Sequence, residues 1–175
     1  MTRTQLEHII RAAADIADDD EIVVIGSQSI LGAHPTAPAS LLVSAEADVF
    51  PRNRPERWDL IDGSIGEGSP FHETFGYYAQ GVEEGTATLP AGWKDRLVLV
   101  CNAGTRFAKG WCLEPHDLVL AKYAAAREKD LRFGKDAIGA GLVGEALLLE
   151  RLETMPVDGD AKARMRTLIT RAGRA

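Results

Sequence analysis

Two acidic side chains, Glu46 and Asp48, stand two residues apart in a short and otherwise apolar stretch that ends at Phe50. Residues two apart on a β-strand point to the same face, so we expect the two carboxylates to project side by side. Paired carboxylates are ligands for a divalent cation such as Mg²⁺ or Mn²⁺. Two surface acids on an edge strand are the alternative, and the apolar neighbours favour the metal site.

A second motif, Gly26-Ser27, follows the apolar run from Ile22 to Ile25 and precedes a short expected helix. Backbone N–H groups at the start of a helix are free to bind phosphate. The sequence therefore places a phosphate-binding turn before a pair of metal-binding acids.

A third set of charged residues lies in a long, largely apolar segment from Pro115 to Phe133, which we predict to be one buried helix. Lys122 lies two turns before Asp130 and less than a quarter-turn away from its direction on that helix, and Arg127 is one turn before Asp130. Buried charges are costly unless they are paired or used. In a purely structural interpretation, Lys122 extends its amine to solvent and Asp130 pairs with Arg127.

The hydrophobic periodicity predicts the elements that must position these groups. Thr2 and Gln5 form a potential capping box for the first helix. The segment 62–76 reads as a surface loop. Helices are expected at 2–17, 27–31, 55–61, 115–133, 142–154 and 158–171, strands at 22–25, 41–43, 47–50, 97–100 and 111–113, and a hairpin from 77–80 and 86–89.

This element order predicts an α/β (α+β) fold with a C-terminal helical bundle. We expect an α/β core at residues 1–112 and a helical region at 113–175, packed together as one compact unit. The length of 175 residues and the hydrophobic content of 45% suit such a unit.

Composition excludes several classes of protein. A net charge of −6 argues against a broad nucleic-acid-binding surface, although it permits one local basic patch. No apolar run is long enough to span a bilayer, and the first residues do not resemble a signal peptide. Cys101 and Cys112 lack metal-ligand spacing. We therefore expect a cytoplasmic protein with reduced thiols and no membrane partner.

The ordered motifs resemble the nucleotidyltransferase superfamily, the DNA polymerase beta-like fold in its minimal form. This resemblance implies a small mixed β-sheet flanked by helices. That pattern is a hydrophobic strand, Gly-Ser, a short helix and two acids on the next strand. Gly26-Ser27 and Glu46-x-Asp48 fill these places, with Glu in place of the usual first Asp and a longer loop between the motifs.

The segment from Leu113 to Asp130 is similar to the C-terminal signature of nucleotidyltransferase toxins of the type IV abortive-infection (AbiEii-like) class. In that signature a helical lysine precedes an Arg/Lys-Asp motif, and Lys122 and Asp130 match the two positions. The stretch 71–93 is also similar to an uncharacterised bacterial nucleotidyltransferase family. Together the resemblance spans residues 22 to about 152.

The resemblance implies a metal-dependent enzyme that transfers a nucleoside monophosphate from a nucleoside triphosphate to an RNA (tRNA) or protein hydroxyl. It further implies the toxin of a toxin–antitoxin or phage-defence pair, with a cognate antitoxin as partner. Asp130 would orient Lys122 or Arg127, or act as general base. The implied catalytic residues are Glu46, Asp48, Lys122 and Asp130, with Mg²⁺ (or Mn²⁺) on Glu46 and Asp48 and the nucleotide on Gly26, Ser27, Ser29, Lys122 and Arg127.

One part of the superfamily pattern is not matched. Polymerase beta-like enzymes carry a third carboxylate on a later strand, whereas the corresponding stretch here reads Thr86-Ala-Thr-Leu89. Asp95 or Asp130 would have to take that role. Two alternatives to an active enzyme therefore stay open: a degenerate member that binds a nucleotide or partner without catalysis, and a structural α/β domain with two surface acids.

Overall fold

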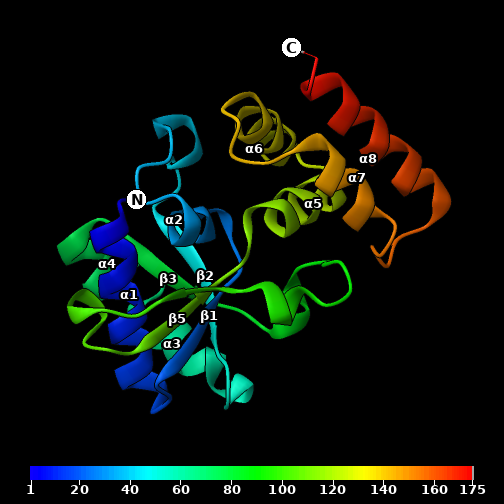
Figure 1. Ribbon diagram of the computed structural model, residues 1–175. Coiled ribbons are helices and arrows are strands. Elements are labelled where there is room, and N and C mark those ends of the chain that lie inside the picture. Colours follow the sequence, from blue (N-terminus) through cyan, green and yellow to red (C-terminus); the bar gives the residue numbers. More distant parts are fainter. Residues whose placement is uncertain (175) are drawn as a thin grey trace.

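The β-branched run after the first helix forms the central strand of a mixed sheet. In the computed structural model, which describes residues 1–174, β1 (Glu21–Val24) pairs antiparallel with β2 (Glu46–Pro51) and parallel with β5 (Lys109–Cys112). β3 (Tyr78–Gly81) extends the sheet beyond β2 in parallel, and β4 (Val98–Val100) extends it beyond β5 in antiparallel orientation. The strand order is β3-β2-β1-β5-β4 (Figure 1). The predicted mixed sheet with flanking helices is confirmed.

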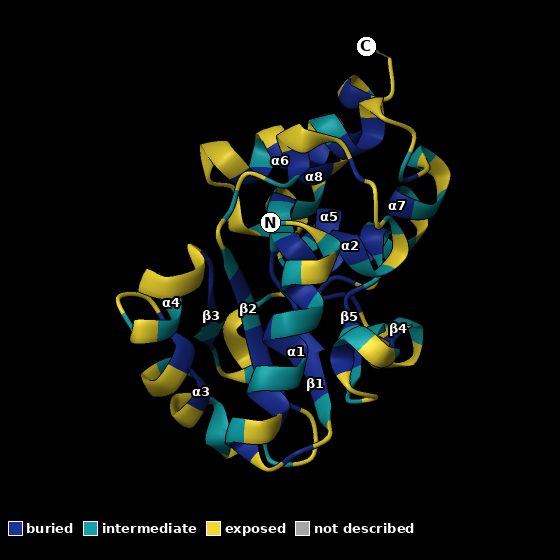
Figure 2. Cartoon of the chain, turned by 90° about the vertical axis from the view of Figure 1, so that its left-hand side faces the viewer, coloured by how far each residue is buried: buried dark blue, intermediate teal, exposed yellow. Residues whose placement is uncertain are grey.

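Helix α1 (Arg3–Ala17) covers one face of this sheet (Figure 2). The predicted capping box is present, because the side chains of Thr2 and Gln5 each accept a backbone N–H of the other residue. The helix ends at Asp18, whose φ of 50° is left-handed. Its buried face packs on Ile22, Val24, Ala47 and Val49. The alternate positions Val23, Ile25 and Phe50 pack together on the opposite face, which is also the face of Glu46 and Asp48.

The connection from β2 to β3 contains two helices, α3 (Trp58–Ile65) and α4 (Pro70–Phe75). The prediction of a loop over 62–76 is therefore wrong. Ser69 caps α4 by accepting the N–H of His72, Pro70 occupies the first turn, and Gly76 ends the helix with a φ of 73°. These capping signals are present in the sequence, and the neighbouring glycines obscured them.

The predicted hairpin from 77–80 and 86–89 is also wrong. β3 lies parallel to β2, with Tyr78 in register with Glu46, and residues 86–89 form no strand. Parallel pairing requires a crossover connection, and α3 and α4 provide it. The Thr-rich stretch after β3 leaves the sheet through a 3₁₀ turn at Glu84–Thr86.

The C-terminal part contains four helices: α5 (Pro115–Ala125), α6 (Glu128–Gly139), α7 (Glu145–Leu152) and α8 (Gly159–Ala172). The single helix predicted for 115–133 is broken at Ala126, which has a left-handed φ of 56°. After this break α6 folds back against α5. A Cβ at Gly134 would lie only 2.3 Å from Cε1 of Tyr123, so the absence of a side chain there permits the close packing of the two helices.

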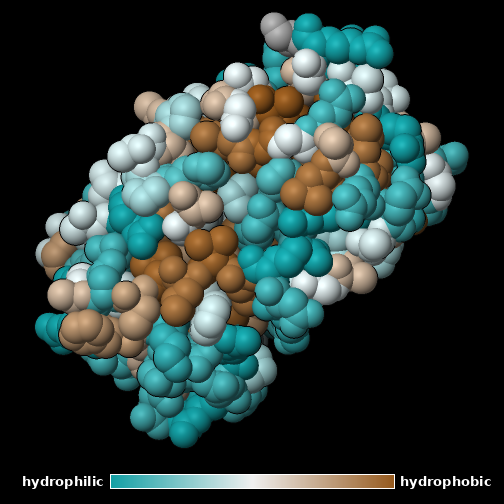
Figure 3. Space-filling model, in the orientation of Figure 1, coloured by the Kyte–Doolittle hydropathy of each residue, from teal (hydrophilic) through white to brown (hydrophobic). Residues whose placement is uncertain are grey.

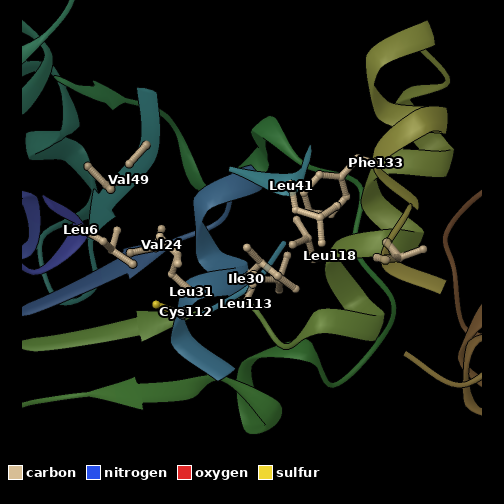
Figure 4. Close-up of a cluster of buried hydrophobic side chains, with 14 of the residues drawn as sticks. Leu6, Val24, Ile30, Leu31, Leu41, Val49, Cys112, Leu113, Leu118 and Phe133 are labelled. Carbon is tan, nitrogen blue, oxygen red and sulfur yellow. The ribbon is translucent and has the colours of Figure 1, made fainter. Parts of the chain in front are cut away.

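One apolar core joins the sheet to these helices. Figure 4 shows Leu6, Val24 and Val49 on the sheet side, Leu118 and Phe133 on the helical side, and Ile30, Leu31 and Leu41 between them. Ile30 and Leu31 belong to the short helix α2 (Ile30–Ala33), which follows the Gly26-Ser27 turn. On the face shown in Figure 3, apolar side chains gather in patches bordered by hydrophilic ones. Within residues 1–174, no helix combines the length and the apolar character needed to cross a membrane.

Candidate active site

A cavity of about 1090 Å³ lies between the sheet and the helices α5 and α6. Its walls come from the turn after β1, from β2, from residues 86–88 and from both helices. The cavity therefore collects segments that are distant in sequence. Seven of the residues predicted from the sequence line it: Gly26, Ser27, Glu46, Asp48, Lys122, Arg127 and Asp130.

The two acids enter the cavity from β2. Both side chains are partly exposed, whereas the alternating Ala47 and Val49 are buried against α1. The Tyr78 hydroxyl, on the neighbouring strand, donates a hydrogen bond of 3.0 Å to Oε2 of Glu46. Burial, this hydrogen bond and the Glu46 charge raise the pKa of Tyr78 to about 12, so the phenol keeps its proton and holds the carboxylate in place.

Asp48 lies directly against Gly26. A Cβ on Gly26 would come 1.7 Å from Oδ2 of Asp48, so only glycine leaves room for this carboxylate. Burial first, and then the charge of Glu46, raise the pKa of Asp48, and Lys122, Lys129 and Arg127 partly oppose them. The glycine turn and the acid pair are thus one packed unit.

Asp130 is 1% exposed and connects two cations on the opposite wall. Its Oδ1 lies 3.1 Å from Nζ of Lys122, and its Oδ2 accepts a hydrogen bond of 2.6 Å from Nε of Arg127. Eight residues of uninterrupted helix would separate Lys122 and Asp130 by about 12 Å along the axis. The break at Ala126 is what allows them to meet.

These ion pairs determine the protonation of Asp130. Burial raises its pKa, but the hydrogen bond from Arg127 and the charge of Lys122 outweigh that effect, and the net shift is downwards. A carboxylate that stays ionised between two cations is suited to orienting them.

Ser29, which the resemblance assigned to the nucleotide, does not line the cavity. Its side chain is fully buried, and its Oγ has no hydrogen-bond partner among residues 1–174. Lys129, Thr86 and Thr88 line the cavity and were not predicted. Lys129 is adjacent to Asp130, so the sequence motif could have indicated it. The two threonines lie in the second arm of the incorrectly predicted hairpin, which hid their role.

The strand beside β2 is β3, where Gln80 stands opposite Asp48, so the third carboxylate of the superfamily pattern is not on that strand. Thr86 and Thr88, from the stretch after β3, line the cavity, and Asp95 lies in a 3₁₀ turn (Trp93–Arg96) outside it. The other two acids that line the cavity, Glu128 and Asp130, both belong to α6. Within residues 1–174, no cluster of three or more His, Cys, Asp or Glu side chains could hold a metal ion.

The chemistry of the donors nevertheless fits a divalent cation. Glu46 and Asp48 form no ion pair within residues 1–174, and their mutual repulsion contributes to the raised pKa of Asp48. A cation bound there would relieve that repulsion and take its remaining ligands from water and a bound anion. The cationic wall formed by Lys122, Arg127 and Lys129 faces the same cavity. Such a cavity suits a polyphosphate with its metal ion.

The chain matches a protein-family model over most of its length. The model described as "Nucleotidyltransferase of unknown function (DUF6036)" matches residues 4–167, which is nearly the whole chain. Searches of curated proteins and of solved structures found no match.

Proposed function

The chain belongs to this family of nucleotidyltransferases of unknown function, and on that premise we propose that it transfers a nucleoside monophosphate from a nucleoside triphosphate to an acceptor hydroxyl, with Mg²⁺ or Mn²⁺ as cofactor. The observation that carries the proposal is the shared cavity. Four motifs, separated by up to about a hundred residues, line one space with carboxylates on one wall and cations on the other.

Each group has a role that follows from its chemistry. Backbone N–H groups at Gly26 and Ser27 bind phosphate oxygens, and Ser27 adds a hydroxyl. Lys122 and Arg127 compensate negative charge on the phosphates, while Asp130 holds both cations in position. Glu46 and Asp48 would hold the divalent cation, which supplies charge compensation at the phosphates when it is bound.

For the acceptor we propose an RNA, such as tRNA, or a protein hydroxyl, and for the biological setting a toxin that acts with a cognate antitoxin in the cytoplasm. The support for this part is the resemblance of the Lys122 and Asp130 motif to AbiEii-like toxins. It is independent of the cavity geometry and is tested separately.

The activity is tested by incubating purified protein with each labelled nucleoside triphosphate, total RNA and Mg²⁺ or Mn²⁺. We expect label on RNA or protein with the wild type, and a loss of at least about 100-fold for Asp48→Asn, because one carboxylate of the pair is gone. Asp95→Asn is the matched control, since this acid lies outside the cavity. No incorporation under any condition would reject catalysis.

A second candidate is a non-catalytic nucleotide-binding protein of the same family. Gln80, in the place opposite Asp48 on β3 where a third carboxylate could stand, favours it. Titration calorimetry separates the two candidates. An enzyme should bind nucleoside triphosphate more tightly with Mg²⁺ and lose that gain in Asp48→Asn, whereas metal-independent binding without turnover supports the second candidate.

A further inference from the structure

A second groove, of about 600 Å³, lies beside the catalytic cavity between α6 and α8. Glu128 and Arg132 line both spaces, so this turn of α6 forms a ridge between them. Beyond the ridge the groove is lined by Lys135 from α6 and Arg171 from α8. The groove is therefore next to the catalytic cavity and has its own charged groups.

Tyr123 contributes a hydrogen-bond donor to this groove. Its side chain is 3% exposed, and its hydroxyl makes no hydrogen bond with any other group in residues 1–174. Burial raises the pKa of Tyr123 to about 12, so the hydroxyl keeps its proton. The hydroxyl keeps some contact with solvent. An anionic acceptor in the groove could therefore take its hydrogen bond in place of water.

The cations form a stripe. Lys129, Arg132 and Lys135 follow one another at intervals of three residues on α6, about 4.5 Å of helix rise per step. Lys129 faces the catalytic cavity, Arg132 both spaces, and Lys135 the groove. Within residues 1–174, Lys135 and Arg171 take part in no ion pair, and Arg132 has only an exposed contact of 3.5 Å with Glu128. A stripe leading into a cavity suits a chain of phosphates better than a single anion.

We propose that the α6–α8 groove binds the phosphates of a single-stranded nucleic acid whose end enters the catalytic cavity, which makes the acceptor a nucleic acid. The inference rests on the proposed function in one respect, namely that the end of the nucleic acid is the acceptor of the transferred nucleotide. Binding of nucleic acid to the groove can be tested without any assay of transfer. Glu128 and Asp136 also line the groove and repel phosphate, so only a few phosphates are contacted. Three cations, Arg132, Lys135 and Arg171, outnumber these two acids, so the groove keeps a small positive charge.

The test is fluorescence anisotropy of a labelled oligouridylate of about 12 nucleotides, measured over a range of salt concentrations. The Lys135→Gln/Arg171→Gln double variant should bind at least about ten-fold more weakly, and its log–log salt slope should fall by about 1.4, because each single-strand phosphate contributes about 0.7. Lys162→Gln/Arg164→Gln removes the same charge from α8 outside the groove and should change neither value appreciably. Tyr123→Phe should weaken binding by about two- to ten-fold.

Calorimetry with nucleoside triphosphate distinguishes this inference from the proposed function. The groove variants should bind nucleoside triphosphate as the wild type does. If the oligouridylate binds equally well to the groove and control variants, or if inorganic phosphate competes as effectively as the oligonucleotide, the inference is overturned. Loss of nucleoside triphosphate binding in the groove variant would also overturn it, because the groove would then belong to the nucleotide. Absence of transfer activity with groove-dependent oligonucleotide binding would reject only the proposed function.

Discussion

At the scale of single residues, the contact between Gly26 and Asp48 is the most constrained feature of the site. The sequence indicated a glycine turn and an acid pair as separate motifs. It could not indicate that a Cβ on Gly26 would lie 1.7 Å from the Asp48 carboxylate, because that contact depends on the pairing of β1 with β2. Glycine is required here because a side chain would not fit beside Asp48. The backbone does not require glycine, since any residue can adopt a φ of −81°.

Gly26→Ala should therefore displace the Asp48 side chain without unfolding the protein. We expect transfer activity to fall at least about 100-fold, the loss associated with a misplacement of about 1 Å at a reacting centre. Gly63→Ala is the control, because a Cβ there has nothing within 4 Å and the position lies in α3. Initial rates with saturating nucleotide and circular dichroism spectra of both variants provide the measurement. Near-normal activity in Gly26→Ala would show that the position of the Asp48 carboxylate is unimportant.

The raised pKa of Asp48 gives a second prediction at this scale. Burial, followed by the Glu46 charge, makes the folded state bind the Asp48 proton more tightly than the unfolded state does. Stability therefore falls as the pH rises from the unfolded pKa, about 3.9, through the higher folded pKa. At neutral pH the ionised side chain destabilises the fold, a cost that active sites often carry.

Asp48→Asn should raise the free energy of unfolding at neutral pH by roughly 0.5–2 kcal/mol. Each kcal/mol corresponds to a rise in Tm of about 2–4 °C for a domain of this size. Urea unfolding at neutral pH and at about pH 3.5 checks the sign, because wild-type Asp48 is protonated at the lower pH and the difference should shrink. Added Mg²⁺ should stabilise the wild type more than the variant. An equal gain at both pH values would contradict the electrostatic explanation.

At the scale of elements, the errors of the sequence analysis have physical causes. Alanine strongly favours helix, so nothing local at Ala126 indicates that the chain turns back there. The break follows from tertiary packing, in which Tyr123 covers Gly134. In contrast, the cap signals of Ser69, Pro70 and Gly76 were readable, and α4 was predictable from them.

An ion-pair network fixes the start of α5 to its neighbours. Asp117 is fully buried and pairs with Arg96 at 2.8 Å and with Arg151 of α7 at 2.9 Å. Arg151 also pairs with Glu114, which caps α5 by accepting the N–H of His116 at 3.0 Å. The network thus joins the segment before β4, α5 and α7, and it lies outside the candidate active-site cavity.

Arg151→Met should destabilise the protein by about 3–5 kcal/mol, since it removes one partner of a buried carboxylate while keeping most of the apolar stem. Arg166→Met is the matched control, because Arg166 pairs with Glu153 across side chains that are 50% and 58% exposed, and its loss should cost less than about 1 kcal/mol. Chemical denaturation of both variants gives the two values. Similar losses for the two would show that burial of the network contributes little.

At the scale of the whole molecule, the sequence predicted an α/β part and a helical part, and the candidate active-site cavity uses walls from both. The predicted boundary at residue 112 falls between β5 and α5. The core, however, does not divide there, because Ile30, Leu31 and Leu41 pack with Leu118 and Phe133 (Figure 4). Hydrophobic patterns identify the buried faces of elements, but which faces share a core is decided only by the fold.

A shared core and a shared cavity predict cooperative unfolding. All three tryptophans, Trp58, Trp93 and Trp111, precede α5, so their fluorescence reports on the sheet part. Far-ultraviolet circular dichroism reports largely on helices, including α5 to α8. Because the core is continuous, we expect both signals to change with the same urea midpoint, as in a two-state transition. A chain shortened to residues 1–112 would expose the apolar surface that Leu118 and Phe133 cover, and it should be unfolded or aggregated. Separate midpoints, with a shortened chain that keeps its native fluorescence, would show instead that the acids and the cations of the site lie on two independently stable units.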